Sequence, residues 1–442
     1  MAIWLVHILK KGARHIRVFG FKSFITKLPQ KVRAWTLRFL AERSRTNPIE
    51  VPSEVVEANS RYETVPRVRP LGPLQVFSIP SSGRRVNLVT DSINASSLFG
   101  GVSTSIIFCA LLAKRLNCQL RVITRTEKAA SHNFSEVLKN NKVAYKDNVE
   151  FMYVDLFSTS IDIDVSSDDL FVATSWWTAH SCLESIEANK IIYLLQEDER
   201  MFYPYGDDHL RCSSVLSNPD IKFVVNTELL FEHFVSQGFQ NIAQNGQWFE
   251  PSFSSYGSIA ALDQHSPAKK KLFFYARPNN YRNLFYLGLK TLDAAVARGI
   301  LNPEVWEIYF VGQDLSTADL PKAFKPTIIE GLNWAEYVSF IGSVDVGLSL
   351  MYTPHPSYPP LDLAASGAIA VTNQHGIKQD LSRYSNNIIC KRADVESLLQ
   401  GIEEAIILSD SEHLRLENYK NNKLLKDWEK SFECVLEVLQ PI

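Results

Sequence analysis

Short runs of β-branched and aromatic residues alternate with longer segments of helical periodicity from residue 84 onward. This alternation is typical of α/β domains built on a parallel sheet. Six expected strands come first, at residues 84–91, 119–126, 149–156, 169–177, 190–198 and 222–227. Six more follow, at residues 270–278, 306–314, 326–331, 345–352, 367–373 and 386–391. The pattern therefore predicts an α/β protein with two Rossmann-like domains.

The segments around these runs give the expected domain boundaries. Residues 46–83 are rich in proline and lack an apolar period, which indicates a connector. Residues 245–270 are polar and are expected to link the two domains. A helix expected over residues 417–439 follows no new strand and is a candidate for crossing between them. We therefore divide the chain into a basic helical extension with its connector, an N-terminal domain and a C-terminal domain, at residues 1–83, 84–250 and 251–442.

Composition and cysteine spacing narrow the class of protein. The 442 residues are 45% apolar and 21% charged, as in soluble globular proteins of two or three domains. The six cysteines are scattered, with no C-x-x-C pair and no histidine cluster beside them. This spacing predicts neither a zinc site nor a disulfide framework, and it favours a reducing cytoplasm.

The N-terminal segment is strongly basic, unlike the rest of the chain, since residues 1–45 carry eleven Lys or Arg against one acid, Glu42. Its longest apolar run, IWLV, is far below the roughly 20 residues that span a bilayer, so no transmembrane helix or secretory signal is expected. The segment is predicted to form amphipathic helices. Such helices lie on anionic membranes or cap the acidic remainder of the chain, and the sequence leaves both open. Nucleic-acid binding is disfavoured because no basic stripe continues into the body.

Open α/β sheets bind ligands beyond the carboxyl ends of their strands, so candidate chemistry is sought there. Gly100 and Gly101 follow the first expected strand and precede a helix. Free amides at a helix N-terminus suit a phosphate or sugar oxygen, although a plain tight turn explains the pair equally well. The spacing is not that of a G-x-G-x-x-G dinucleotide fingerprint.

A pair of arginines marks the corresponding position in the second domain. Arg277 ends its first expected strand, and Arg282 and Asn283 stand at the entrance of the next helix. Two guanidiniums at a strand end and a helix start are expected to converge on one ligand. Their bidentate hydrogen bonds suit a pyrophosphate.

The stretch LSLMYTPHPSYPPLDLAASG, residues 348–367, runs from an apolar strand through four prolines into a small-residue helix. The prolines exclude both helix and ladder pairing before Pro360. Pro360 itself suits a first helical turn, and Gly367 suits the helix end. The sequence therefore predicts a rigid loop, which loses little entropy when a ligand binds.

Several groups of this loop are candidates for binding a donor substrate. Tyr352 ends the strand, and the loop offers the backbone amides of His355, Ser357 and Tyr358. Asp362 is expected in the first helical turn. There it either complements the helix dipole or accepts hydrogen bonds from ligand hydroxyls.

The first domain contributes four polar residues, Gln196 to Glu199, at the end of its fifth expected strand. If the sheet interpretation holds, they face the interdomain cleft. Charged groups directly after a buried strand suit substrate hydroxyl binding or general-base work, and they also suit a solvated loop. Gln196 and Glu197 are taken as the candidates.

Two further motifs have ordinary structural explanations. Trp176 and Trp177 can form a sugar-stacking wall, but core packing is the commoner fate of tryptophan, and His180 fits a helix face. Asp162 and Asp164 have the D-x-D spacing with which metal-dependent transferases hold a nucleotide through a divalent ion. They lie in a polar run rich in Asp, so we interpret them as part of a loop with chance spacing.

The motifs FGGVSTSI, ATSWWTA, YLLQEDERMFYPYG, YARPNNYRN and PHPSYPPLDLAASG together carry a resemblance. The chain resembles retaining glycosyltransferases of the two-Rossmann GT-B architecture. Within these it is similar to bacterial rhamnosyltransferases that extend surface and S-layer glycans from dTDP-L-rhamnose. The resemblance covers the body from about residue 84 onward, and the preceding basic region also looks familiar from that group.

The resemblance assigns roles to individual positions. The superfamily's Arg and Lys that hold the donor pyrophosphate fall on Arg277 and Arg282. Its pair of Glu residues, eight apart, falls on Pro354 and Asp362, so the first acid is absent and the second is shortened. The sugar contacts of the wider superfamily therefore do not transfer directly.

The resemblance also implies a reaction and a location. The superfamily's pocket histidine falls on Gln196, and Trp334 occupies a region near the nucleotide base. With Glu197, which is a candidate from its place after a buried strand, the catalytic set is Gln196, Glu197, Arg277 and Arg282. L-Rhamnose moves from dTDP-L-rhamnose to a growing, lipid-linked glycan with retention, without a bound metal or other cofactor. The implied location is the cytoplasm, with residues 1–45 contacting the inner face of the membrane.

Other functions remain open at this stage. The same architecture serves glycosyltransferases with other nucleotide sugars and nucleotide-sugar epimerases, which need no acceptor. A two-lobed sugar-binding protein is disfavoured because such proteins are usually exported and a signal peptide is not seen.

Overall fold

The computed structural model describes residues 71–80, 83–94, 100–156, 162–253, 269–315, 321 and 323–439. The basic extension expected over residues 1–45 lies outside these ranges, as does most of the expected connector. Within them, every helix is too short or too polar to cross a membrane.

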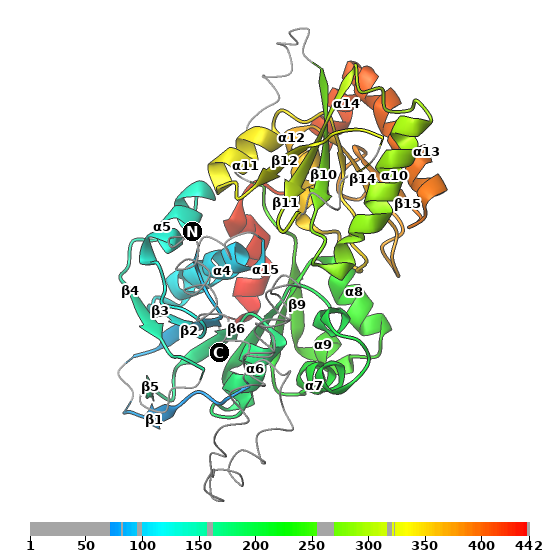
Figure 1. Ribbon diagram of the computed structural model, residues 1–442. Helices are drawn as coiled ribbons and strands as arrows, with labels where there is room; N and C mark the ends of the chain where they lie inside the picture. Colours follow the sequence, from blue (N-terminus) through cyan, green and yellow to red (C-terminus); the bar gives the residue numbers. More distant parts are fainter. Residues whose placement is uncertain are drawn as a thin grey trace, which may run out of the picture. The chain divides into compact units, whose positions relative to one another are not determined.

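The first sheet, with its helices, is called the first lobe. Its strands are β2 (Arg85–Thr90), β3 (Gln119–Thr124), β4 (Val149–Tyr153), β6 (Leu170–Ala173), β7 (Ile191–Leu195), β8 (Lys222–Asn226) and β9 (Gly246–Phe249). Its helices are α4 (Gly101–Leu116), α5 (Ser131–Asn140), α6 (Trp176–Leu183), α7 (Asp207–Leu216), α8 (Glu228–Ser236) and α9 (Gln240–Asn245), with the 3₁₀ helices η2 (Ala188–Lys190) and η3 (Glu199–Phe202). In the described ranges all strand pairs are parallel, in the order β4-β3-β2-β6-β7-β8-β9 (Figure 1).

The second lobe is built on a second parallel sheet. Its strands are β10 (Lys270–Ala276), β11 (Trp306–Gly312), β12 (Thr327–Glu330), β13 (Val346–Leu348), β14 (Ile369–Asn373) and β15 (Ile388–Lys391). Its helices are α10 (Phe285–Ala297), α11 (Trp334–Ile341), α12 (Tyr358–Ser366), α13 (Val395–Asp410) and α14 (Glu412–Lys420), with the 3₁₀ helix η5 (Tyr281–Asn283). The strands described there follow the order β12-β11-β10-β13-β14-β15.

The expected α/β architecture is confirmed, since each of the twelve strand segments predicted from the sequence contains a strand. Three short strands were not expected. β9 lies in the segment interpreted as a linker and extends the first sheet beyond β8. β1 (Val76–Ser78), in the expected connector, pairs with β5 (Ile163–Val165). With only three or four residues each, these strands have no apolar run long enough to be recognised.

Each sheet is covered on both faces, which is why its strands are continuously apolar. Side chains alternate between the faces along a strand. On β7, Ile192 and Leu194 pack in one core with α4 and α5, whereas Tyr193 and Leu195 pack in another with α6 and α7. In the second lobe the two cores lie against α10 and α13, and against α11 and α12 (Figure 1).

The end of the chain returns to the first lobe. The helix expected over residues 417–439 is two helices, because α14 ends at Lys420 and α15 (Trp428–Leu439) begins after a break. Figure 1 shows α15, in red, beside α4. The Phe432 ring lies 5.1 Å from Phe108 on α4 and 4.3 Å from Phe249 on β9, measured between ring centroids. α15 thus completes one core of the first lobe.

Candidate active site

Strand order places the candidate site at two switch points. In each sheet the first strand in the chain lies beside the fourth, and the connections from these two strands run in opposite directions. A crevice forms at that position outside the carboxyl ends of the strands. In the second lobe the crevice lies between two loops. The loop after β10 carries the arginine pair, and the loop after β13 is the proline-rich loop.

A cavity of about 440 Å³ lies at this position. Its described lining comes from both lobes, so a ligand there contacts the first turn of α4 and the switch-point loops of the second lobe. The residues that line the cavity include Gly100, Ser103, Thr104, Arg277, Gln313, Trp334, Tyr337, Met351, Ser357, Tyr358 and Asp362.

Arg277 presents a positive charge to the cavity. Its guanidinium makes two long hydrogen bonds, of 3.4 Å each, to the Tyr275 hydroxyl and the Gln313 side-chain carbonyl. Among the described residues no carboxylate forms an ion pair with it. An arginine held in a cavity by neutral partners is suited to an anionic ligand such as a diphosphate.

Trp334 and Asp362 line the cavity on the α11 and α12 side. Trp334 is the first residue of α11, and its ring lies 5.9 Å from that of Tyr337. The Tyr337 hydroxyl donates to the buried Asp362 carboxylate at 3.0 Å. Burial, together with this carboxylate, raises the pKa of Tyr337, so the phenol stays a donor.

The helix-dipole explanation for Asp362 is wrong. α12 begins at Tyr358 with Pro359 and Pro360 in its first turn, so Asp362 stands in the second turn, where the dipole effect has faded. The expected helix end at Gly367 is confirmed by its left-handed φ of 88°. α12 also packs tightly on β13, because a Cβ on Gly347 would lie 2.3 Å from the Leu363 side chain.

The proline-rich loop is rigid but offers fewer amides than expected. The His355 amide donates to the Thr353 hydroxyl at 3.3 Å, and the Ser357 amide donates to His355 Nδ1 at 2.9 Å. Ser357 adopts a left-handed φ of 71° to make this turn. Of the three expected amides, only that of Tyr358, at the start of α12, is left for a ligand.

Tyr358 joins the two lobes at the cavity wall. Its hydroxyl lies 2.7 Å from Thr104 Oγ1 on α4 and accepts from Asn226 Nδ2 at 3.0 Å. Gly100, the residue just before α4, has a φ of 68°, and a Cβ there would touch the Tyr358 ring at 3.6 Å. Gly100 therefore serves both a turn and a close contact between lobes. The first turn of α4 contributes Ser103 and Thr104 to the cavity wall, and the Thr104 amide donates to the Gly100 carbonyl at 3.1 Å.

A second contact between the lobes is ionic. Arg282 Nη1 donates to Glu197 Oε2 at 3.1 Å, and the Thr353 hydroxyl donates to Glu197 Oε1. The Arg282 guanidinium lies over the Phe202 ring, 4.1 Å from its centroid. Burial raises the pKa of Glu197, and Arg282 opposes this shift. The two arginines expected to converge are thus in different situations, because Arg277 faces the cavity while Arg282 is neutralised.

Other predicted residues support the loops. Asn283, which is fully buried, donates to the Leu350 carbonyl at 3.3 Å and so ties η5 to the end of β13. The half-exposed Tyr352 donates its amide to the Arg282 carbonyl at 2.7 Å. Gln196 donates to the Gly101 carbonyl at 2.7 Å, and its side chain packs against that glycine.

In the polar run after β7, the side chain of Glu197 forms hydrogen bonds to Arg282 and Thr353 of the second lobe. Asp198 is buried between Arg200 and His233, which hold its pKa at about 2 despite burial. Glu199 accepts from the Trp176 amide at 2.7 Å and so caps α6. Asp198 and Glu199 therefore have structural roles, because groups of the first lobe supply their ion pairs and hydrogen bonds.

The tryptophan pair is also built into the first lobe. Trp176 is buried, as its core-packing interpretation predicts, and donates to the Tyr203 hydroxyl at 3.0 Å. Trp177 donates to Asp91, which follows β2, at 3.0 Å. His180, on α6, lies 4.0 Å from Glu184 one turn later, as expected of a helix face.

Sequence reasoning missed two residues of the site. Thr353 was not singled out, although it holds Glu197. Lys378, which has no exposed surface, donates to the Met351 carbonyl at 3.0 Å. A lysine in a polar loop is normally solvated, so no sequence signal marks it as buried.

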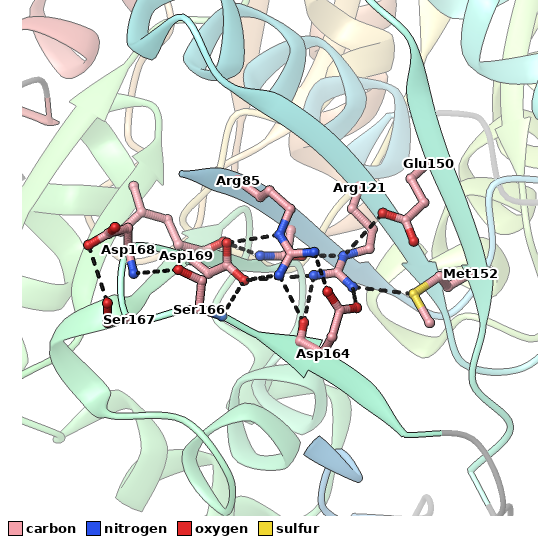
Figure 2. Close-up of polar contacts among 11 residues, drawn as sticks. Arg85, Arg121, Glu150, Met152, Asp164, Ser166, Ser167, Asp168 and Asp169 are labelled. Carbon is pink, nitrogen blue, oxygen red and sulfur yellow. Dashed lines mark hydrogen bonds and ion pairs between the residues drawn. The ribbon is translucent and has the colours of Figure 1, made fainter. Parts of the chain in front are cut away.

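The D-x-D pair belongs to a different region. The loop interpretation is wrong for Asp164, which lies on β5 and binds Arg85 at 2.6 Å and Arg121 at 2.7 Å (Figure 2). Arg85 also binds Asp169 at 2.7 Å. This arginine–aspartate network lies near the amino ends of β2 and β6, opposite the ligand-binding edge. Within the described ranges no group of three or more His, Cys, Asp or Glu is arranged to hold a metal ion.

Comparison with known proteins identifies the family. One family model, described as WsaF, N-terminal domain, matches residues 85–228, and another, described as WsaF, C-terminal domain, matches residues 270–403. Together they cover more than half of the chain. The chain belongs to the WsaF family. The two matches in this WsaF-family chain begin at the first residues of β2 and β10, which are the first strands of the two lobes.

The WsaF-family chain also has a curated relative. It is 29% identical over 243 residues to the O-antigen biosynthesis protein RfbC of Myxococcus xanthus. The match covers 54% of this chain and 18% of RfbC, so the chain spans less than a fifth of that protein's length.

Solved structures establish that this WsaF-family chain has the GT-B fold. HepE of Anabaena, in complex with UDP and glucose, aligns with a TM-score of 0.56 and 11% identity over 81% of this chain and 99% of its own. Sucrose-phosphate synthase of Thermosynechococcus elongatus gives 0.54 and 11% over the same shares. UDP-GlcNAc 2-epimerase of Neisseria meningitidis, bound to UDP-GlcNAc, gives 0.50 and 9% over 81% and 100%. The GT-B fold expected from the sequence is confirmed.

Proposed function

We propose that this chain is a glycosyltransferase that moves L-rhamnose from dTDP-L-rhamnose to a growing surface-glycan acceptor, with retention. The observation that carries the proposal is the cavity at the switch point of the second lobe, where Arg277 has no carboxylate partner among the described residues and the first turn of α4 forms the opposite wall. Membership of the WsaF family and the relationship to an O-antigen biosynthesis protein support glycan synthesis.

The lining residues suit the parts of a nucleotide sugar. Trp334 offers a flat aromatic surface to the base, and the Asp362 carboxylate accepts hydrogen bonds from hydroxyls. Arg277 suits the diphosphate, and the positive end of the α4 helix dipole adds to its charge. In this assignment the second lobe binds the donor, and the first lobe, with Gln196 and Glu197 at its edge, receives the acceptor.

The main demand of the reaction is the negative charge that accumulates on the departing dTDP. Arg277 stabilises this negative charge directly. Arg282 can do so once the diphosphate replaces Glu197 as its partner, which frees the Glu197 carboxylate at the acceptor side. The leaving phosphate would take the acceptor proton on the same face of the sugar, as the resemblance implies.

We expect no metal or other cofactor, because arginine side chains and helix amides supply the positive charge. Transfer should then be unchanged in excess EDTA. A rate that falls with EDTA and recovers with Mg²⁺ or Mn²⁺ would contradict this part of the proposal.

The acceptor is proposed to be lipid-linked, with residues 1–45 contacting the membrane. Their eleven bases should bind anionic vesicles. Co-sedimentation with phosphatidylglycerol vesicles, compared between the full chain and a variant lacking residues 1–45, tests this contact. Equal sedimentation of the two would reject it.

A thermal-shift comparison of dTDP, UDP, GDP and ADP tests the donor, because a ligand that binds the native state raises its melting temperature. We expect the largest shift with dTDP. The Arg277→Ala variant should keep its stability and lose transfer on the order of 10²- to 10³-fold. A preference for UDP or GDP would overturn the rhamnose assignment, and full activity of the variant would overturn the site.

The alternative with a specific observation is a nucleotide-sugar epimerase, because a 2-epimerase shares this fold. Incubation with donor alone distinguishes the two, since only an epimerase turns over without an acceptor. If the donor were another nucleotide sugar, the largest rise in melting temperature would come from UDP, GDP or ADP instead of dTDP. A non-catalytic sugar-binding protein would bind without turnover under either condition.

A further inference from the structure

Lys378 is a buried cation that the proposed reaction does not yet use. It lies after β14, and its side chain has no exposed surface. Its ammonium donates to the Met351 carbonyl at 3.0 Å, and among the described residues no carboxylate forms an ion pair with it. An ammonium has three donors, so two remain for other partners.

His355 holds another unused donor close by. It is 4% exposed, and its Nδ1 accepts the Ser357 amide at 2.9 Å. A neutral imidazole that accepts at Nδ1 carries its proton on Nε2. This Nε2 is buried and has no hydrogen-bond partner in the described structure. Burial, helped by Lys378 and Arg282, lowers the pKa of His355 to about 3, so the ring is neutral at physiological pH.

The charges around Lys378 do not balance. The titratable groups that interact electrostatically with it are Glu197 after β7, Cys390 on β15, His355 after β13 and His375 on its own loop. Of these only Glu197 is a carboxylate, and it is already bound to Arg282. The buried Lys378 and the partly exposed Arg282 therefore share one acid. Burial lowers the pKa of Lys378 to about 8, which records the cost of this arrangement.

Both side chains are hydrogen-bonded to residues that line the cavity. Lys378 holds the carbonyl of Met351, and His355 holds the amide of Ser357, and both Met351 and Ser357 line the cavity. A buried charge without a partner is costly, so it is retained where a ligand supplies the partner.

We propose that Lys378 and His355 form a further part of the donor site and donate hydrogen bonds to an oxygen of the nucleotide sugar. This oxygen belongs either to the diphosphate or to a sugar hydroxyl. The inference rests on the proposed function.

The test is the affinity of the full-length Lys378→Met variant for dTMP, dTDP and dTDP-L-rhamnose, measured by calorimetry. Methionine fills the same space without burying a charge, so the variant should fold. We expect at least a tenfold loss. A loss for dTDP and dTDP-L-rhamnose places the diphosphate at Lys378, and a loss for dTDP-L-rhamnose alone places a sugar hydroxyl there. Unchanged affinity for all three overturns the inference.

The matched control is Lys391→Met on β15, whose ammonium pairs with Glu404 at 2.6 Å near the surface. It should bind all three nucleotides like the wild type. A second variant, His355→Asn, keeps an acceptor for the Ser357 amide while removing Nε2, and a smaller loss is expected. Unaltered affinity in His355→Asn would remove His355 from the site.

A pH series separates ligand contact from mere packing. The ligand for this series is the nucleotide whose binding is weakened in Lys378→Met. The affinity of the wild type for it should fall as the pH rises through about 8, where Lys378 loses its charge, and Lys378→Met should lack this fall. If both proteins show the same pH dependence, Lys378 does not touch the ligand. If the wild type binds no nucleotide at all, the proposed function itself fails.

Discussion

Two ionic clusters, each with a buried cation, lie at opposite edges of the sheets, and they differ in how their cations are paired. The arginine–aspartate network at the amino edge of the first sheet pairs Arg85 and Arg121 with Asp164 and Asp169, and Arg121 also pairs with Glu150 at 3.8 Å (Figure 2). We call this cluster balanced because each of its cations forms an ion pair with a carboxylate. At the carboxyl edge, Arg282 and Lys378 share one carboxylate, Glu197. A balanced cluster satisfies itself and fastens β5 to the sheet. An unbalanced cluster at a ligand-binding edge is satisfied only when a ligand arrives.

The largest expected effect comes from breaking the balanced network. Arg121 is fully buried, and Arg121→Ala leaves the buried Asp169 and its neighbour Asp164 with one arginine. Removing one partner of a buried pair costs about 3–5 kcal/mol of unfolding free energy. Urea denaturation measures this loss.

The exposed pair of Lys114 and Glu429 is the control for this variant. Lys114→Ala should cost less than about 1 kcal/mol, because exposed ion pairs contribute little. If Arg121→Ala were no more destabilising than this control, the structural interpretation of the network would be wrong.

Removing the cation of the unbalanced cluster should stabilise the fold instead, because the buried charge of Lys378 lowers the free energy of unfolding. The pKa of Lys378 is lower in the folded state than in the unfolded chain, so the unfolded chain binds more protons between about pH 8 and 10.5. The wild type should therefore gain on the order of 2 kcal/mol between pH 7 and pH 10 relative to Lys378→Met. Denaturation of both proteins across this range measures the difference. Parallel pH curves would contradict the assignment of the low pKa to Lys378.

The smallest effect concerns the acid of the unbalanced cluster. Glu197→Gln removes the carboxylate that competes with a diphosphate for Arg282, so the affinity for dTDP should rise about three- to tenfold, or roughly 1 kcal/mol. Calorimetry measures this gain, with Glu184→Gln on the surface as control. A lower affinity for dTDP would show that Glu197 supports the donor instead of competing with it.

The sequence predicted the architecture well because parallel strands buried on both faces leave long apolar runs. Such runs identify β7 and β10 at once, whereas β5 has only three residues and lies in a polar stretch rich in Asp. The left-handed φ of Gly367 was also foreseeable, because few residues other than glycine end a helix in this way.

The site was predictable only in part. Strand ends located Arg277 and Asp362 on the cavity, since their position follows from the topology. The pairing of Arg282 with Glu197 joins residues 85 positions apart in different lobes, and no local pattern records it. Nor does a local pattern record that the amides of His355 and Ser357 are used within their own loop.

The position of α15 has a consequence for the order in which the protein is made. Five of its side chains complete the core of the first lobe, namely Trp428, Phe432, Val435, Leu436 and Leu439. During synthesis the strands of that lobe leave the ribosome first, but this core stays open until residue 439 has followed. The second lobe meets no such delay, because its cores draw on residues up to Leu424. The lobe that is translated first is therefore the last to be completed, and a chaperone that shields its open core has the whole time of the second lobe's synthesis in which to act.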